Sequence, residues 1–266
     1  TNRVKAAPVR WTEGVCLRKR ARAVFANSGN ANACTGQDGI GDAQRTAWLV
    51  AQQLDCPLEE VCILSTGVIG VPLPMDRIER GVTDCMAALS REGGSDAAAA
   101  IMTTDTVPKE IAVEVPLEHG TVRIGAIAKG SGMIAPNMAT MLSVLTTDAT
   151  IGADLLGAVL SDVVEQSFNR ICVDNDMSTN DTVLCLANGA AGLPALEANP
   201  DDFRIFEQTL GQVCIGLAQA LVRDGEGATK FVEILVEGAA SDEDAQRIAR
   251  SVATSQLCKT AFFGSD

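Results

Sequence analysis

Residues 128–142, which read AKGSGMIAPNMATML, join two apolar stretches through a run of small side chains. Both flanking stretches have the composition of buried strands. The glycines do not form a phosphate-binding loop, because Lys129 precedes them instead of closing a G-x-x-x-x-G-K-[ST] pattern. Two interpretations stay open from these residues alone: a Gly-rich turn between two strands, and a point at which the chain is cut.

The chemistry of a cut at this point is simple. A threonine hydroxyl can attack the carbonyl group before it, and water then cleaves the ester that forms. Here the small side chain of Ala139 leaves that carbonyl accessible, and Thr140 becomes a new N-terminus. Its α-amine, with a reference pKa of about 7.7–8.0, can act as the base for its own hydroxyl. Nucleophilic catalysis is then available to a chain whose only histidine is His119.

Predicted strands and helices are interleaved along the rest of the chain. Helical spacing is found from Ala43 to Leu54 and from Phe203 to Leu221, with Asn199 placed to cap the second helix. A third helix can begin at Ser241, with Asp244 as its capping partner. The order is neither strictly alternating nor segregated, which favours an α+β class over a doubly wound sheet. Strands are expected at Arg22–Asn27, Val61–Thr66, Ile111–Val115, Thr121–Ala128, Met141–Thr146, Thr182–Asn188 and Phe231–Val236.

Composition excludes several classes of function. The 266 residues carry a formal net charge of -13, which argues against a nucleic-acid or anionic-membrane partner. No apolar run approaches the roughly 18 residues of a transmembrane helix, and the first ten residues lack the apolar core of a signal peptide. The nine cysteines include no C-x-x-C pair, so we expect no metal site and mostly buried, reduced thiols in a cytoplasmic protein.

Seven short motifs occur along the chain: Asn27–Ala33, Ser65–Gly70, Met102–Thr106, Lys129–Leu142, Ser178–Thr182, Asp224–Lys230, and Lys259–Ala261 with Phe263–Gly264. In the same order, they resemble the motifs of the ornithine acetyltransferase (glutamate N-acetyltransferase) family of arginine biosynthesis. They extend over essentially the whole chain, and the order of all seven makes a chance match very improbable. The chain departs from the family at Asn175, where glycine is usual, and at Met177, where a smaller residue is usual.

The resemblance implies the catalytic residues. It makes Thr140 the nucleophile, freed by cleavage between Ala139 and Thr140, and it makes Thr66 and Gly67 the oxyanion hole. A hydroxyl and a backbone N–H in a Gly-rich turn can both be aimed at one developing negative charge. Without the family, Thr66 and Gly67 would be interpreted as an ordinary turn at the end of a strand.

The resemblance also implies the substrate contacts. Lys129 corresponds to the family's contact to the substrate carboxylate, Glu226 to the contact to its amino group, and Thr103 to a polar contact. Thr140 itself also touches the substrate. From the residues alone, a solvated lysine and a solvated acid in a turn would be the simpler interpretations of Lys129 and Glu226.

The family's fold is a layered α/β sandwich of the self-cleaving N-terminal-nucleophile type, with two central sheets between helices. By this resemblance residues 1–139 form the α-chain part and residues 140–266 the β-chain part, cut from one precursor and expected to assemble as an α2β2 heterotetramer. The chain starts at Thr1 without a methionine and stops inside a patterned region, so we expect both parts to be truncated. No cofactor is expected. Family members differ in their use of acetyl-CoA as a second donor, and no residue here decides that point.

The implied reaction moves an acetyl group from N2-acetyl-L-ornithine to L-glutamate through acetyl-Thr140. Two other classes stay open. One is an N-terminal-nucleophile hydrolase or aminopeptidase that uses the same Thr140. The other is a binding module without catalysis, whose Gly-rich loops hold an anion.

Overall fold

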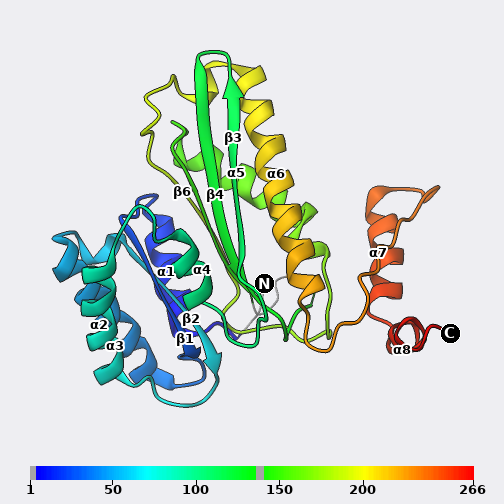
Figure 1. Cartoon of the computed structure of the whole chain (residues 1–266), viewed down its shortest axis with the longest axis horizontal. Coiled ribbons are helices and arrows are strands. Elements are labelled where there is room, and N and C mark those ends of the chain that lie inside the picture. The colour runs from blue at the N-terminus through cyan, green and yellow to red at the C-terminus, as the bar shows by residue number, and fades with distance from the viewer. Residues whose placement is uncertain (1–3, 136–140) are drawn as a thin grey trace.

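The computed structural model describes residues 4–135 and 141–266, and within them the fold is mixed α/β, with two sheets and eight helices (Figure 1). Three short 3-10 helices, η1 (Leu58–Glu60), η2 (Phe168–Arg170) and η3 (Leu196–Ala198), complete it. The strands are β1 (Ala23–Asn30), β2 (Val61–Val68), β3 (Lys109–Leu117), β4 (Gly120–Lys129), β5 (Leu142–Thr147) and β6 (Thr182–Ala187). The helices are α1 (Ala7–Leu17), α2 (Gly36–Leu54), α3 (Met75–Ala88), α4 (Gly94–Ala100), α5 (Ala153–Gln166), α6 (Pro200–Arg223), α7 (Asp242–Ala253) and α8 (Gln256–Gly264).

Most of the predicted elements are present. Six of the seven expected strands coincide with β1–β6 to within a few residues. Both predicted caps form: Asn199 accepts hydrogen bonds from the first turn of α6, and Ser241 accepts one from the backbone N–H of Asp244. The strand expected at Phe231–Val236 is wrong, because this segment is irregular and no described strand pairs with it. The expectation of mostly buried cysteines is also wrong, since only Cys62 and Cys214 are buried.

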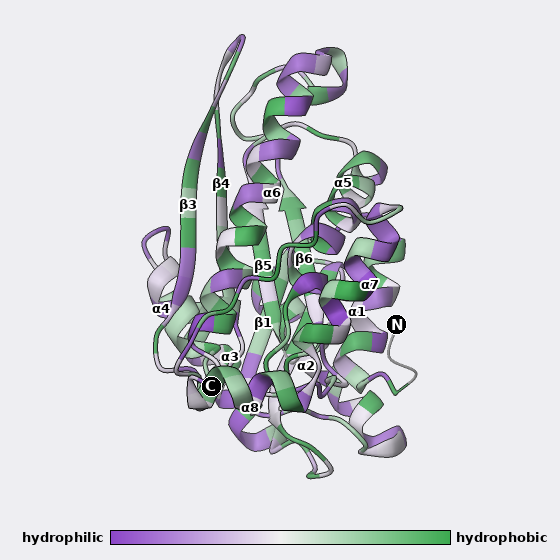
Figure 2. Cartoon of the chain, turned by 90° about the vertical axis from the view of Figure 1, so that its right-hand side faces the viewer, coloured by the Kyte–Doolittle hydropathy of each residue, from purple (hydrophilic) through white to green (hydrophobic). Residues whose placement is uncertain are grey.

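The larger sheet has the strand order β3-β4-β5-β6 and carries the larger core. β3, β4 and β5 are antiparallel neighbours, while β5 and β6 are parallel. Helices α5 and α6 pack on this sheet, and more buried residues alternate with exposed ones along β3, as expected for a strand with one covered face. Figure 2 shows that the foot of β3 is hydrophilic and its middle hydrophobic. The core residues of α6 include Phe206, Leu210, Leu217 and Leu221, none of them more than 1% exposed.

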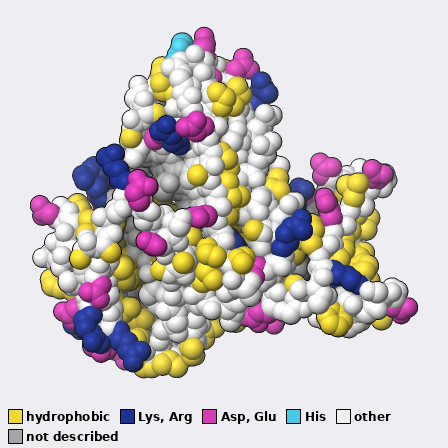
Figure 3. Space-filling model, in the orientation of Figure 1, with side chains coloured by type: hydrophobic (Ala, Val, Ile, Leu, Met, Phe, Trp, Pro, Cys, Tyr) yellow, Lys and Arg dark blue, Asp and Glu magenta, His cyan; other side chains and the backbone are white. Residues whose placement is uncertain are grey.

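Helix α6 is the one described helix that is long and apolar enough, by length and composition alone, to cross a membrane. Its apolar side chains lie instead in the core of the larger sheet, as in the central helix of a globular domain. On the face of the molecule that Figure 3 shows, basic side chains occur in small groups among acidic ones.

The smaller sheet consists of β1 and β2, which run parallel in the register Ala23↔Val61. One of its faces packs on α2 and α3. Its other face meets the larger sheet through an apolar cluster, and the side chain of Asn180 donates to the backbone oxygens of Ala31 (2.7 Å) and Ser65 (2.8 Å). The two sheets are therefore joined where β2 approaches β5. The apolar cluster contains Val15, Cys62, Leu64, Leu142 and Leu184.

Side chains of α1 satisfy the edge of β2 that faces away from β1. Trp11 donates its indole N–H to the carbonyl of Val61 (2.9 Å). The hydroxyl of Thr12 donates to the carbonyl of Ile63 (2.7 Å) and accepts from the N–H of the same residue (2.8 Å). An unpaired strand edge would leave buried polar groups, so these contacts hold α1 on the sheet.

Replacement of Thr12 by valine should lower the free energy of unfolding by about 1–3 kcal/mol, because both polar groups of Ile63 lose their partner in a buried place. Urea denaturation of the two proteins measures this difference. The matched control is Thr83→Val on α3, where the hydroxyl is exposed and bonds only to its own helix. A Thr12→Val protein as stable as the control would show that the hydrogen bonds between Thr12 and Ile63 do not stabilise the fold.

Candidate active site

The structure places five predicted site residues at the ends of elements. Thr66 and Gly67 lie near the end of β2, Thr103 follows α4, Lys129 is the last residue of β4, and Glu226 follows α6. Three of them meet directly through the side chain of Lys129, which contacts the hydroxyls of Thr66 and Thr103. Segments far apart in sequence are thus brought to one place.

The predicted nucleophile Thr140 and the cleavage partner Ala139 lie outside the described residues, as does Asn137. Met141 is the first described residue after them. Leu142 pairs with Lys129 across the antiparallel strands β5 and β4. Met141, the residue that follows Thr140, therefore lies next to the strand pair at the end of β4 that carries Lys129.

Lys129 is a buried cation, with only 2% of the residue exposed. Its ammonium group donates to Thr103 Oγ1 (2.8 Å) and Thr66 Oγ1 (3.2 Å), and it lies 3.9 Å from Asp105 Oδ2. Burial lowers the pKa of this ammonium, and the nearby carboxylate of Asp105 opposes that effect. An ammonium has three N–H donors, and the described residues accept from two of them, which leaves one for an incoming carboxylate.

Thr66 and Gly67 are paired with β1 inside strand β2, and Gly67 has a backbone conformation that favours glycine. Gly67 has a φ of +132°, and a Cβ on it would lie 2.2 Å from the carbonyl carbon of Gly29. Thr66 is buried, and its oxygen accepts from Lys129, so its own hydroxyl proton points away from that ammonium. A hydroxyl oriented in this way is suited to donate to a developing oxyanion.

Glu226 is exposed and lies over the Gly-rich segment that follows β4. Its backbone N–H donates to the carbonyl of Ser131 (2.7 Å). Its carboxylate packs against Gly132, where an added Cβ would come within 2.6 Å of the carboxyl carbon. Any larger residue at Gly132 would displace this side chain. The site thus combines a buried cation with an anion at its rim.

Three charged residues near the site were not singled out from the sequence: Asp105, Lys109 and Asp224. Lys109 Nζ lies 2.7 Å from Asp105 Oδ1 and 2.6 Å from Asp224 Oδ2, with all three side chains largely buried. Burial alone would raise the pKa of each carboxyl, but hydrogen bonds from Lys109 and from backbone N–H groups outweigh it and hold both values below the ordinary range. The only sequence signal was that both acids belong to family-like motifs.

Asp181 is a further carboxyl that contacts the chain next to the candidate site. It accepts a hydrogen bond from the backbone N–H of Met141 (3.0 Å), the residue that follows Thr140. Burial raises the pKa of Asp181 from 3.8 to about 8, although hydrogen bonds from Met141 and Ser178 act against the increase. This carboxyl can therefore exchange a proton near neutral pH.

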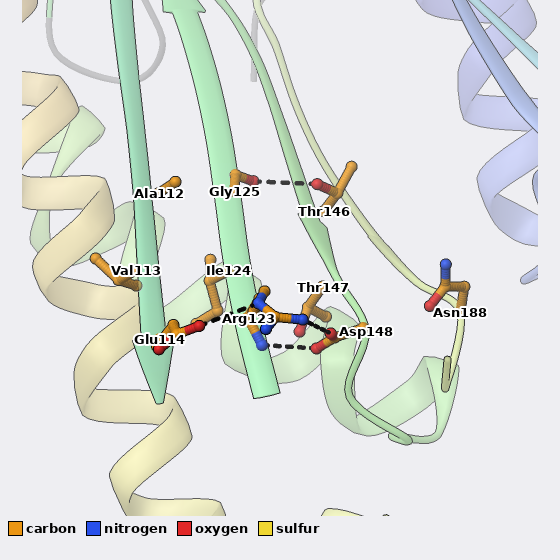
Figure 4. A pocket seen from close by; sticks show the side chains of 10 residues that line it. All are labelled: Ala112, Val113, Glu114, Arg123, Ile124, Gly125, Thr146, Thr147, Asp148 and Asn188. Carbon is orange, nitrogen blue, oxygen red and sulfur yellow. Dashed lines mark hydrogen bonds and ion pairs between the residues drawn. The ribbon is translucent and has the colours of Figure 1, made fainter. Parts of the chain in front are cut away.

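A hollow of about 530 Å³ lies elsewhere, over the face of β3, β4 and β5 (Figure 4). An ion pair of Arg123 with Glu114 (3.2 Å) and with Asp148 (3.8 Å) crosses it. None of the predicted site residues lines this hollow, so it is separate from the candidate site. Within residues 4–135 and 141–266, no group of three or more His, Cys, Asp or Glu side chains is placed to hold a metal ion.

Comparison with known proteins decides the family, because the model of the ArgJ family matches residues 1–266. The chain belongs to the ArgJ family. The resemblance inferred from the seven motifs is thereby confirmed.

Relatives of the ArgJ family match along the whole chain. The arginine biosynthesis bifunctional protein ArgJ of Symbiobacterium thermophilum is 54% identical over 266 residues, which are all of this chain and 66% of the relative. The protein of the same name from Geobacter sulfurreducens is 51% identical over 271 residues, covering all of this chain and 68% of the relative. The crystal structure of ornithine acetyltransferase from Mycobacterium tuberculosis complexed with ornithine is 43% identical, covers 53% of this chain and 74% of that one, and has a TM-score of 0.48. The chain spans about two thirds of the length of its ArgJ relatives.

The carboxyl of Asp181 gives this ArgJ-family chain a testable pH dependence. Its folded pKa is about 8 and its ordinary value 3.8, so the folded state holds a proton that the unfolded state has lost between these values. Stability from this group is complete below about pH 4 and falls as pH rises towards 8. Asp181→Asn keeps an oxygen for the N–H of Met141 and does not titrate.

The melting temperature of Asp181→Asn, relative to the parent protein, should therefore increase steadily from pH 4 to pH 8. Differential scanning calorimetry of both proteins at matched pH values measures it. Asp84→Asn on the exposed face of α3 controls for the loss of one negative charge. A difference in melting temperature that does not change with pH would rule out the protonated carboxyl.

Proposed function

We propose that this chain belongs to an acetyltransferase that moves an acetyl group from N2-acetyl-L-ornithine to L-glutamate in arginine biosynthesis. The observation that carries the proposal is the buried ammonium of Lys129, which is bonded to Thr66 and Thr103. Lys129 also pairs in the sheet with Leu142, two residues after the predicted nucleophile. Both substrates are amino acids with a free carboxylate, which such a cation would bind. The names of the ArgJ relatives place them in the same pathway.

In the proposed mechanism, Thr140 Oγ1 attacks the acetyl carbonyl carbon while the α-amine of Thr140 takes the hydroxyl proton. The hydroxyl of Thr66 and the backbone N–H of Gly67 stabilise the oxyanion of the tetrahedral intermediate. The C–N bond then breaks, the α-amine returns the proton to the leaving ornithine, and an acetyl ester remains on Thr140. In the second half-reaction the amine of glutamate attacks the carbonyl carbon of that ester, and the C–O bond to Thr140 breaks. The α-amine of Thr140 takes the proton from the glutamate amine and passes it to Thr140 Oγ1, which regenerates the hydroxyl.

Lys129 and Glu226 are proposed to orient the substrates. The ammonium of Lys129 would bind the α-carboxylate that both substrates share, together with the hydroxyl of Thr103. Glu226, exposed at the rim, would attract the side-chain amino group of ornithine. A buried cation and an exposed anion would thus set the direction in which the substrate lies.

The finer features of the fold and assembly follow the family and remain proposals. These are a layered sandwich with two central sheets, an α chain ending at Ala139, a β chain starting at Thr140, and an α2β2 heterotetramer in the cytoplasm. Acetyl-CoA as a second donor belongs to the same group of proposals.

A mixing assay tests the function directly, using protein expressed from its complete reading frame. Incubation with N2-acetyl-L-ornithine and L-glutamate should yield ornithine and N-acetylglutamate in equal amounts. Ornithine and free acetate formed at the same rate without glutamate would favour the hydrolase instead. Neither product, together with an uncut chain, would favour a binding module.

Cleavage should depend on the hydroxyl of Thr140. The parent protein should separate into two chains, and the β chain should start at Thr140. Thr140→Ala should stay intact because no nucleophile remains, and Thr140→Ser should be cut slowly. Intact mass spectrometry measures the products. Cleavage of the alanine variant at the parent rate would refute self-processing by this residue.

The hydroxyl of Thr66 should matter mainly in the transition state. Thr66→Ala is expected to reduce kcat by about 10²–10³ fold with much less effect on KM, as for other oxyanion-hole donors. Thr66→Ser keeps the hydroxyl and should retain most of the activity. Steady-state kinetics of the two variants decides the point, and near-normal turnover of the alanine variant would remove Thr66 from the mechanism.

A further inference from the structure

The carboxylate of Asp105 contacts the backbone next to Lys129 and the residue Thr103, which is one of the two acceptors of the Lys129 ammonium. Its Oδ1 accepts from the backbone N–H of Gly130 (2.7 Å), the residue after Lys129. Its Oδ2 accepts from the backbone N–H of Thr103 (3.1 Å), whose hydroxyl accepts from the Lys129 ammonium. The same Oδ2 lies 3.9 Å from the Lys129 ammonium itself. One carboxylate therefore fixes both the backbone beside this lysine and one of its acceptors.

Two further charges make this arrangement electrically balanced. Lys109 bonds to Asp105 (2.7 Å) and to Asp224 (2.6 Å), so two cations and two anions share the buried region. Asp224 also accepts from the backbone N–H of Thr106 (3.0 Å) and precedes Glu226 by two residues. Removing one partner from such a group leaves a buried charge uncompensated, which is why all four depend on one another.

We propose that Asp105 is a positioning residue that keeps the Lys129 ammonium charged and directed at the substrate, while Lys109 and two backbone N–H groups hold Asp105 in place. The distance of 3.9 Å is central to this role. Asp105 supplies negative charge without taking a hydrogen bond from the ammonium, so a donor is left for the ligand. As the ligand is the α-carboxylate of the amino-acid substrate, the proposal rests on the proposed function.

The charges that face Lys129 determine whether the pKa of its ammonium rises or falls when one of them is removed. Burial lowers the pKa of its ammonium most strongly, and the positive charge of Lys109 lowers it further. The negative charges of Asp105, Asp181 and Glu226 raise it, with Asp105 the largest of the three. Loss of the Asp105 charge should therefore move the pKa of Lys129 further down, and loss of the Lys109 charge should move it up.

Asp105→Asn tests the proposal because it keeps the shape and removes the charge. The 13Cε signal of Lys129, assigned by its absence in Lys129→Met, should titrate at lower pH than in the parent protein. In the transfer assay, the alkaline limb of kcat/KM should shift to lower pH, with a loss of about tenfold per pH unit above the new pKa. The acid limb, set by the α-amine of Thr140, should stay in place.

Asp224→Asn is the matched control, since it also removes one carboxylate partner of Lys109 but does not belong to the groups that face Lys129. It should destabilise the protein as Asp105→Asn does, yet leave the Lys129 titration close to that of the parent. If Asp105→Asn does not fold, the charge-balanced variant Lys109→Met/Asp224→Asn keeps Asp105 and should move the titration upward.

An unchanged Lys129 titration in Asp105→Asn, or equal downward shifts in Asp105→Asn and Asp224→Asn, would overturn the proposal. So would a downward shift in the charge-balanced variant, should Asp105→Asn fail to fold. The spectroscopic signal does not depend on turnover. A parent protein without acetyl transfer, in which Lys129 still responds to Asp105, would refute the proposed function and leave the positioning role standing.

Discussion

The buried ammonium of Lys129 is the constraint on which the arrangement of this molecule depends. A charged group removed from water costs several kcal/mol unless the protein supplies hydrogen bonds and an opposite charge. Those groups come from β2 and from the segment between α4 and β3. The chain satisfies this one cation only when its smaller and larger sheets are packed together.

The two sheets are held together by apolar contacts and hydrogen bonds close to the Lys129 ammonium. Leu64 of β2 packs against Leu142 and Leu184 of the larger sheet, two residues before Thr66 reaches the ammonium. Asn180 adds two buried hydrogen bonds to the smaller sheet, and its neighbour Asp181 holds the backbone of Met141. Apolar packing thus brings the strands together, and the polar groups at their ends fix the register in which the site forms.

Local patterns were enough to predict most of the fold, and they failed where pairing was needed. Six strands and both helix caps follow from alternation, apolar spacing and capping residues that lie close together in sequence. The segment 231–236 has the same composition as a strand, but a strand also requires a neighbour, which composition does not reveal. The ion pairs that join Asp105, Lys109 and Asp224 were not predicted, for a related reason. Asp105 and Asp224 are 119 positions apart (224 − 105), and a lone acid in a sequence is most simply interpreted as solvated.

The burial of Lys129 has two opposite consequences, one for its attraction to a carboxylate and one for the pKa of its ammonium. In a region of low dielectric an ammonium attracts a carboxylate more strongly than it would at the surface, so burial would strengthen the substrate contact proposed for Lys129. The same burial lowers the pKa of the ammonium and weakens its hold on the proton. A hydrogen-bonded carboxylate would secure the charge but would occupy the donor that the substrate needs. A carboxylate at 3.9 Å, held by Lys109 and two backbone N–H groups, secures the charge and leaves that donor to the ligand.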